Sequence, residues 1–231
     1  MRYQRVGSGP PVVMLHGLSG STRWWSRNVE ALARQYCVYL VDLPGFGSMA
    51  RVRQRFALLQ AANWMVQWMD AIGLQRAHFI GHSMGGFVCL WIAAHRPEAV
   101  ERLVLVAPAV IPHVHSIFGY IMPLLKSMRY MTPQFFMVVS TDTLRMGFIT
   151  LLRAVHDLIS IHLDDEIETV QVPTLLIWGE DDTLVPPSLG ELLHQKMLHA
   201  SLRIIPKAGH VCMFDQPAIF NATVKNFLAG H

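Results

Sequence analysis

A serine between glycines is the first residue of this chain that could do chemistry. Ser83 stands in the pattern G-x-S-x-G, with Gly81 before it and Gly85 after it. Residues with almost no side chain at those two positions permit a turn so tight that the serine oxygen is exposed at its tip. A serine hydroxyl is a poor nucleophile near neutral pH, so it needs a base to take its proton and a third group to orient that base. Because so short a pattern often arises by chance, its flanks and partners decide its meaning.

The sequence on either side of Ser83 supplies the elements that such a turn needs. Residues 77–80 are apolar enough for a short buried strand, and residues 87–94 are typical of a buried helix. The helix would point its N-terminus at the serine and so favour negative charge there. The strand, the turn and the helix together predict an exposed nucleophile.

Two later loops carry residues that could serve as the base and its partner. Asp182 follows a predicted strand at 173–178, and His210 follows one at 201–205. A histidine can accept the serine proton, and a carboxylate can fix its tautomer and stabilise the imidazolium that forms. The chain therefore offers a complete set of nucleophile, acid and base, with Asp181 as a second carboxylate in the same loop.

Strands and helices are predicted to alternate along most of the chain. Besides those already named, the strands are expected at 2–6, 12–15, 37–41 and 102–107, and the helices at 21–36, 51–73, 188–199 and 217–228. This alternation predicts an α/β fold with a mostly parallel, doubly wound sheet that binds ligands at the carboxyl ends of its strands. His16, Asp42 and Ser83 each directly follow a strand, so we expect them on one rim.

The alternation pauses between residues 111 and 166. No strand pattern is convincing there, and apolar residues recur at helical spacing from Leu144 to Leu158. We expect a small helical insertion that covers the rim as a cap, or lid. The predicted organisation is a core of residues 1–110 and 167–231 with a cap at 111–166.

The composition excludes several classes of protein. The formal net charge of the 231 residues is only +3, and the basic residues are scattered, so nucleic acid is not an expected partner. The three cysteines show neither a disulfide framework nor metal-ligand spacing. No apolar run reaches the roughly 18 residues of a membrane span, and no signal region opens the chain. We expect a cytoplasmic protein without metal, cofactor or stable membrane insertion, and the sequence leaves its oligomeric state open.

At this point the chain resembles the α/β-hydrolase superfamily, in the branch with a His-Gly loop and a helical cap. The resemblance rests on the chain order Ser83, Asp182, His210 and on four motifs: His16-Gly-Leu, Asp42-Leu-Pro-Gly-Phe-Gly, Gly179-Glu-Asp-Asp-Thr-Leu-Val-Pro and Ala208-Gly-His. It covers nearly the whole chain. One departure is that the family normally has a hairpin of two strands before the His-Gly loop, whereas only residues 2–6 are available here.

The resemblance assigns a role to each motif. The backbone N–H groups of Leu18 and Met84 would form the oxyanion hole, and Asp182 rather than Asp181 would be the acid, because it stands three residues after Gly179. His16 and Asp42 would have structural places in their loops.

The implied activity is that of a serine carboxylic-ester hydrolase acting on a small-molecule ester with a short or medium acyl chain. Leu18, Met122 and Val211 are expected to line its pocket. Serine at the turn argues against the haloalkane dehalogenases and epoxide hydrolases, which carry aspartate there and which this branch also resembles.

Two alternatives stay open. The first is a carbon–carbon bond hydrolase of ring-cleavage diketones. Such relatives commonly have an aromatic residue where this chain has Val211, and they use a cap arginine, for which Arg129, Arg145 or Arg153 could serve. The second is a ligand receptor of the same fold with little turnover.

Overall fold

A seven-stranded sheet forms the centre of the molecule, in the order β1-β3-β2-β4-β5-β6-β7. The computed structural model describes residues 1–50, 56–111, 119, 121–128 and 131–231. The strands are β1 Arg2–Val6, β2 Pro11–Leu15, β3 Cys37–Asp42, β4 Ala77–His82, β5 Val100–Val106, β6 Thr174–Gly179 and β7 Ala200–Ile205. β1 pairs antiparallel with β3, and the other neighbouring strands pair parallel. The predicted mostly parallel α/β sheet is confirmed.

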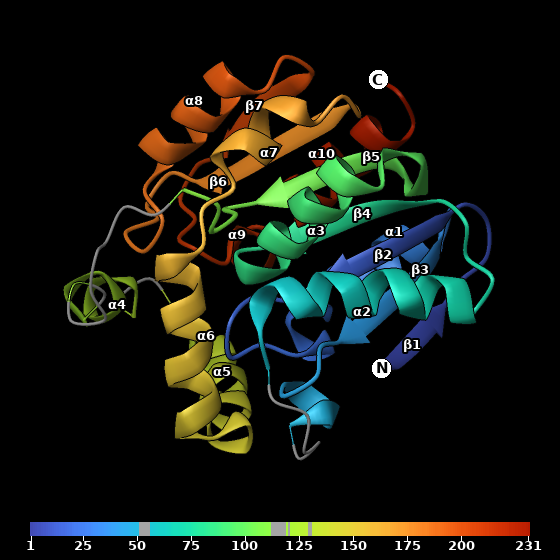
Figure 1. Ribbon diagram of the computed structural model, residues 1–231. Coiled ribbons are helices and arrows are strands. Elements are labelled where there is room, and N and C mark those ends of the chain that lie inside the picture. Colours follow the sequence, from blue (N-terminus) through green and yellow to red (C-terminus); the bar gives the residue numbers. More distant parts are fainter. Residues whose placement is uncertain (51–55, 112–118, 120, 129–130) are drawn as a thin grey trace.

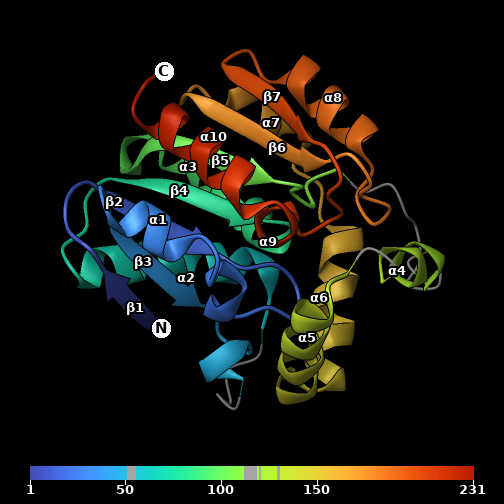
Figure 2. The same ribbon diagram turned by 180° about the vertical axis from the view of Figure 1, so that it is seen from behind.

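Helices cover both faces of this sheet (Figures 1 and 2). One face carries α2 Leu58–Ala71, α3 Met84–His95, α7 Asp164–Thr169 and α8 Pro187–Lys196. The other carries α1 Val29–Ala33, α9 Cys212–Asp215 and α10 Pro217–Leu228. Side chains alternate between the two faces along a strand, so Val13 and Leu15 of β2 pack in one hydrophobic cluster while Val12 and Met14 pack in the other.

The central strands are buried along their length, because helices lie on both sides of them. All six residues of β4 and all six of β6 are buried. The edge strand β1 is exposed at all five positions, and its Tyr3 ring packs edge-on against Trp68 of α2. A single strand therefore precedes β2, as the sequence predicted.

A helical insertion lies between β5 and β6, to one side of the sheet layers (Figure 1). It contains α4 Ile121–Ser127, α5 Pro133–Met146 and α6 Phe148–Ser160. α5 packs on the short helices η1 Thr22–Trp25 and η2 Gly47–Met49, and α6 packs on α2. α7 straddles the predicted boundary at residue 166, and the division into core and cap stays a prediction.

No single helix in the described ranges is long and apolar enough to cross a membrane. α5 and α6 would reach that length and composition as a pair, but they are bent by 100° where they meet.

Two predicted helices differ from those observed. The helix expected at 21–36 is divided into η1 and α1, because Asn28 at the break is fully buried and donates from Nδ2 to the Met213 carbonyl and to Asn221 Oδ1, both at 2.9 Å. The helix expected at 51–73 begins at Leu58, where the backbone N–H donates to Asp157 Oδ2 at 2.9 Å. Its predicted first turn at 51–55 lies outside the described residues.

Candidate active site

Ser83 occupies a strained turn between β4 and α3. Its φ is 50° and its ψ is −114°, a left-handed conformation that residues other than glycine rarely adopt. Backbone hydrogen bonds hold the turn, since the Ser83 N–H donates to the Val106 carbonyl at 2.9 Å and the Ser83 carbonyl accepts from Ala109 N at 3.1 Å. The end of β5 thus fixes the turn from the side.

The two glycines of the motif are required by close backbone contacts. A Cβ on Gly81 would lie 2.4 Å from the Gly85 carbonyl oxygen. A Cβ on Gly85 would lie 2.5 Å from the carbonyl oxygen of Leu15 and 2.6 Å from that of His16. The first contact closes the turn on itself, and the second presses it against the loop after β2.

The structure brings His210 together with Asp182. His210 Nδ1 lies 2.8 Å from Asp182 Oδ2, and because a carboxylate only accepts, Nδ1 carries the proton of the neutral imidazole, in which Nε2 keeps a lone pair. The other carboxylate oxygen, Oδ1, accepts from the backbone N–H groups of Leu184 and Val185, both at 2.9 Å. The Asp182 side chain is fully buried, whereas that of His210 is 11% exposed.

Asp181 has a different place in the same loop. Its backbone N–H donates to the Ala208 carbonyl at 2.9 Å, which ties the acid loop to the histidine loop. The side chain that reaches the histidine is that of Asp182, the residue that the sequence favoured.

Ser83 and His210 line one cavity beyond the carboxyl ends of the strands. Among the hydrogen bonds of the described residues, none joins their two side chains. Such a bond often tightens only when substrate is bound. The geometry therefore presents an oriented base and a nucleophile at the same cavity, and their catalytic roles stay predictions.

The loop after β2 approaches this turn closely. A Cβ on Gly17 would lie 3.2 Å from Ser83 Cβ, so the next residue, Leu18, is held beside the serine. Met84 is the first residue of α3, and its N–H has no partner within the helix. Within the described ranges the backbone N–H groups of Leu18 and Met84 have no hydrogen-bond acceptor. Both remain available as the predicted oxyanion donors.

His16 and Asp42 hold the surrounding loops. The buried His16 ring accepts from Leu43 N at Nε2, at 3.3 Å, and its Nδ1 lies 2.9 Å from the Gly17 carbonyl. Burial lowers the pKa of His16. The carboxylate of Asp42 accepts from Thr22 N and Ser48 N, both at 2.8 Å. These contacts fit the structural places expected for both.

His82 makes a contact that the sequence did not predict. Its Nε2 donates to the His210 carbonyl at 2.9 Å, and the two rings are 4.7 Å apart between centroids. The side chain is fully buried, and burial, followed by the neighbouring His210, holds the pKa of His82 well below its usual value. Burial therefore favours the neutral imidazole, which joins the serine turn to the histidine loop.

The cavity has a volume of about 410 Å³ and is lined mainly by apolar side chains. Leu18 and Val211 are among its lining residues, and their contact with substrate stays a prediction. Met122 is 60% exposed and is absent from the lining, so this prediction was wrong. On α4 the lining residues are Leu124 and Ser127, three positions apart on one helical face, whereas Met122, two positions before Leu124, points elsewhere.

Trp24 and Asp215 are two of the lining residues that had no place in the prediction. Trp24 of η1 is buried against Phe135 of α5, with ring centroids 5.0 Å apart. Asp215 Oδ2 accepts from the Gly209 N–H at 2.9 Å and so braces the histidine loop. Burial raises the pKa of Asp215. A serine-histidine motif gives no signal for either. Trp24 reaches the cavity through tertiary packing, and Asp215 through the short helix that follows the histidine loop.

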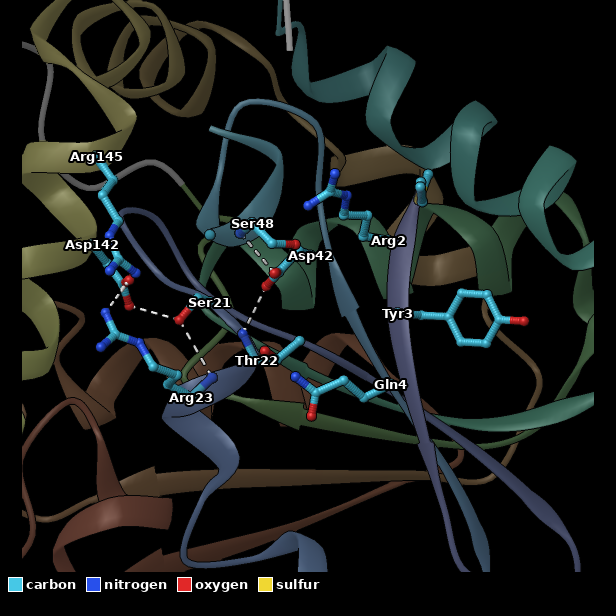
Figure 3. A pocket seen from close by; sticks show the side chains of 12 residues that line it. Arg2, Tyr3, Gln4, Ser21, Thr22, Arg23, Asp42, Ser48, Asp142 and Arg145 are labelled. Carbon is cyan, nitrogen blue, oxygen red and sulfur yellow. Dashed lines mark hydrogen bonds and ion pairs between the residues drawn. The ribbon is translucent and has the colours of Figure 1, made fainter. Parts of the chain in front are cut away.

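A separate polar cleft of about 530 Å³ lies between β1, η1 and α5 (Figure 3). At its wall the buried carboxylate of Asp142 accepts from Ser21 Oγ at 2.7 Å and pairs with Arg23 Nη2 at 2.5 Å. These contacts tether α5 to the start of η1. Arg145 also lines this cleft rather than the cavity at Ser83.

A family model for the α/β-hydrolase fold matches residues 10–127 and 121–217 of the chain. The chain belongs to this family. Its resemblance to the superfamily, inferred from the motifs, is thereby confirmed.

Similar proteins share the hydrolase name but differ in the bond they are named for. RutD of Caulobacter sp. (strain K31), named as a proposed carbamate hydrolase, is 30% identical over 99% of this chain and 96% of its own. A 2-hydroxy-6-oxononadienedioate/2-hydroxy-6-oxononatrienedioate hydrolase of Pseudomonas sp. is 32% identical over 97% of this chain and 90% of its own. A crystal structure of a bacterial membrane phospholipase A is 26% identical, with a TM-score of 0.84 over 99% of this chain and 82% of its own. The chain is thus a hydrolase, and its substrate has to be argued from the site.

Proposed function

We propose that this hydrolase cleaves carboxylic esters with short or medium acyl chains through an acyl-enzyme on Ser83. The observation that carries the proposal is the hydrogen bond between His210 Nδ1 and Asp182 Oδ2, made beside a serine in a strained turn. In the neutral imidazole this bond keeps the proton on Nδ1, so that Nε2 can act as the base at the cavity that Ser83 lines. Serine activated in this way is the standard nucleophile of acyl transfer.

The steps follow from these positions. Ser83 Oγ attacks the acyl carbon while His210 Nε2 takes its proton, and the imidazolium that forms is stabilised by Asp182. His210 then protonates the leaving alkoxide, and later activates the water that releases the acid and restores Ser83. The N–H groups of Leu18 and Met84 would hold the oxyanion, each contributing about 3–4 kcal/mol to the transition state.

The lining of the cavity favours an apolar acyl group without charge. The insertion contributes Phe135, Val139, Phe148, Leu151, Leu152, Val155 and Leu158. Such a wall gains roughly 0.8 kcal/mol for each methylene it buries. The cavity of about 410 Å³ would stop this gain once it is filled.

Carbon–carbon bond cleavage is the second candidate, because the relative named as a 2-hydroxy-6-oxononadienedioate hydrolase is 32% identical. Its named substrate is a diacid, which requires a cationic partner. No lysine or arginine is among the described residues that line the cavity, and Arg153 is exposed on α6. Arg129 lies outside the described residues. The apolar wall therefore favours the ester.

The test is a substrate screen on the purified protein and its Ser83→Ala variant. We expect kcat/KM for p-nitrophenyl esters to rise from acetyl to a maximum at short-to-medium chains and then to fall. Ser83→Ala should lose several orders of magnitude in kcat. A ring-cleavage diketone and a simple carbamate belong in the same screen, and preferred turnover of either would replace the ester. Tight binding of an ester without turnover would instead make the chain a receptor.

A further inference from the structure

Large apolar side chains are exposed where α5 meets α6. Leu144 is 83%, Phe148 71% and Ile149 65% exposed, and Leu152 follows at 36%. We call these four residues the α5–α6 tip. They surround Gly147, whose φ of 82° allows the chain to turn sharply between the helices. An apolar group of this kind at the end of a helical hairpin marks a contact surface.

Much of the tip is not used for packing within the chain. Phe148, Ile149 and Leu152 occupy helical positions i, i+1 and i+4, which form one side of α6. The adjoining side packs inward, where Ala154 is fully buried and Leu151 and Leu158 contact the core cluster. Phe148 and Leu152 also line the cavity. The apolar surface of α6 is therefore wider than the part that other elements cover.

The exposed charged side chains of α5 and α6, whose residues are all described, have one sign. Arg145 and Arg153 directly follow Leu144 and Leu152 in the sequence, and both are exposed. Asp142 is fully buried against Arg23, and Asp157 is half-buried and accepts from the backbone of α2. Residues 131–160 are all described, and none of their carboxylates is exposed.

We propose that the α5–α6 tip docks reversibly on the surface of an anionic lipid bilayer. Apolar side chains in the headgroup region combined with arginines near anionic headgroups give the interaction of peripheral amphipathic helices. A second copy of the chain fits this face less well. A two-fold contact through the tip would bring Arg145 and Arg153 of both copies close together, and like charges would repel.

Docking at the tip would place the cavity entrance against the lipid. Leu124, Phe148 and Leu152 line the cavity and are also partly exposed, so the cavity reaches the surface beside the tip. Apolar esters concentrate in a bilayer rather than in water. The surface would thus bring the entrance to the phase in which such molecules collect. Docking itself does not depend on turnover and can be measured without it.

The experiment is vesicle flotation of the full chain carrying Ser83→Ala. One set of vesicles contains phosphatidylcholine alone, and the other contains phosphatidylcholine with phosphatidylglycerol. The test variant adds Leu144→Ser and Ile149→Ser, because both residues are exposed and neither lines the cavity. The matched control adds Leu192→Ser and Leu198→Ser, two exposed leucines in and just after α8. Circular dichroism checks that both variants fold.

We expect the parent and the control to float with the anionic vesicles and the tip variant to bind about tenfold more weakly. Arg145→Gln with Arg153→Gln should weaken anionic binding roughly fivefold for each charge, and added salt should do the same. Equal flotation of the tip variant and the parent would overturn the proposal, as would flotation independent of lipid charge. If the parent is a dimer in lipid-free solution and the tip variant is a monomer, the tip would instead be the contact with a second copy. In the Ser83 protein, the tip variant should keep the parent's turnover of a soluble acetyl ester.

Discussion

His82 Nε2 donates a hydrogen bond to the backbone carbonyl of His210 over 2.9 Å. On the other side of the ring, a Cβ on Gly17 would lie 2.7 Å from His82 Nδ1, so the imidazole also touches the loop that leads to Leu18. One buried side chain thus connects the turn of Ser83, the loop of His210 and the loop of a predicted oxyanion donor. His82 is therefore placed to set the distance between Ser83 and His210.

This contact predicts a difference between two variants of equal size. His82→Gln retains an N–H donor at the reach of Nε2, whereas His82→Met fills similar space without one. We expect His82→Met to lower kcat roughly ten- to a hundredfold, because a shift of the base by a fraction of an ångström is costly to the reaction. His82→Gln should recover most of that loss. KM should change little in either, and equal losses in both would show that His82 acts by packing alone.

The acid loop allows the two aspartates to be separated. Asp182→Asn removes the charge that faces His210 and favours the wrong tautomer, so we expect kcat to fall by about 10⁴. Asp181→Asn should stay within a few-fold of the parent, because that residue contributes its backbone N–H to the histidine loop. Steady-state measurement of kcat for both variants on one ester that the parent turns over well tests this assignment. A larger loss at Asp181 than at Asp182 would move the role of the acid.

Stability should fall in mild acid because three histidines are buried. The pKa values of His16, His78 and His82 are all lowered by burial. In the unfolded chain these imidazoles titrate near 6.5, so below that pH the unfolded state binds protons that the folded state does not. The free energy of unfolding should then drop by about 1.4 kcal/mol per pH unit for each such group, down to its folded pKa.

Urea unfolding between pH 8 and pH 5 measures this slope. His82→Gln removes one of the three groups and should make the slope shallower. A free energy of unfolding that is constant across this range would contradict the prediction. Asp215, whose pKa is raised by burial, acts in the opposite direction in stronger acid.

The Asp142 carboxylate should matter for the attachment of α5. Asp142→Ala leaves the buried Ser21 hydroxyl without its acceptor, while the Arg23 side chain, 42% exposed, can turn to water. We expect a loss of about 1–3 kcal/mol in the free energy of unfolding. Because α5 also lines the cavity, KM should rise more than kcat falls. Glu30→Ala, which breaks an exposed ion pair with Arg34, should change neither and serves as the control.

Much of the fold was readable from the sequence because a parallel sheet requires buried strands. The strands that end at Asp42 and at His82 are largely apolar and buried, and each leads into a motif with glycine or a polar residue. The ends of the helices were harder to predict. The break at Asn28 depends on acceptors more than 180 residues away, Met213 and Asn221, which local periodicity does not reveal.

The parts of the site that lie in sequence motifs could be predicted, whereas the parts that depend on tertiary packing could not. The resemblance to the family's acid loop favoured Asp182 over Asp181, because Asp182 stands three residues after Gly179. His82 sits in the motif itself, yet its acceptor is a backbone carbonyl, which any residue at 210 would provide. Met122 was assigned to the cavity by its apolar character alone, and the sequence does not say which side of α4 faces inward.

The loops around Ser83, Asp182 and His210 and the wall of the cavity differ in how much substitution they can tolerate. Glycines allow the loops around Ser83, Asp182 and His210 to pack closely. A Cβ on Gly179 would lie 2.2 Å from the Gly209 carbonyl oxygen, so a larger residue there would force the backbone to move. Most of the wall that a substrate meets comes instead from the insertion between β5 and β6. Substitutions in α4, α5 and α6 can reshape the cavity while Ser83, Asp182 and His210 keep their places. A laboratory library confined to these helices should therefore yield new substrate preferences far more often than one spread over the strands and turns of the sheet.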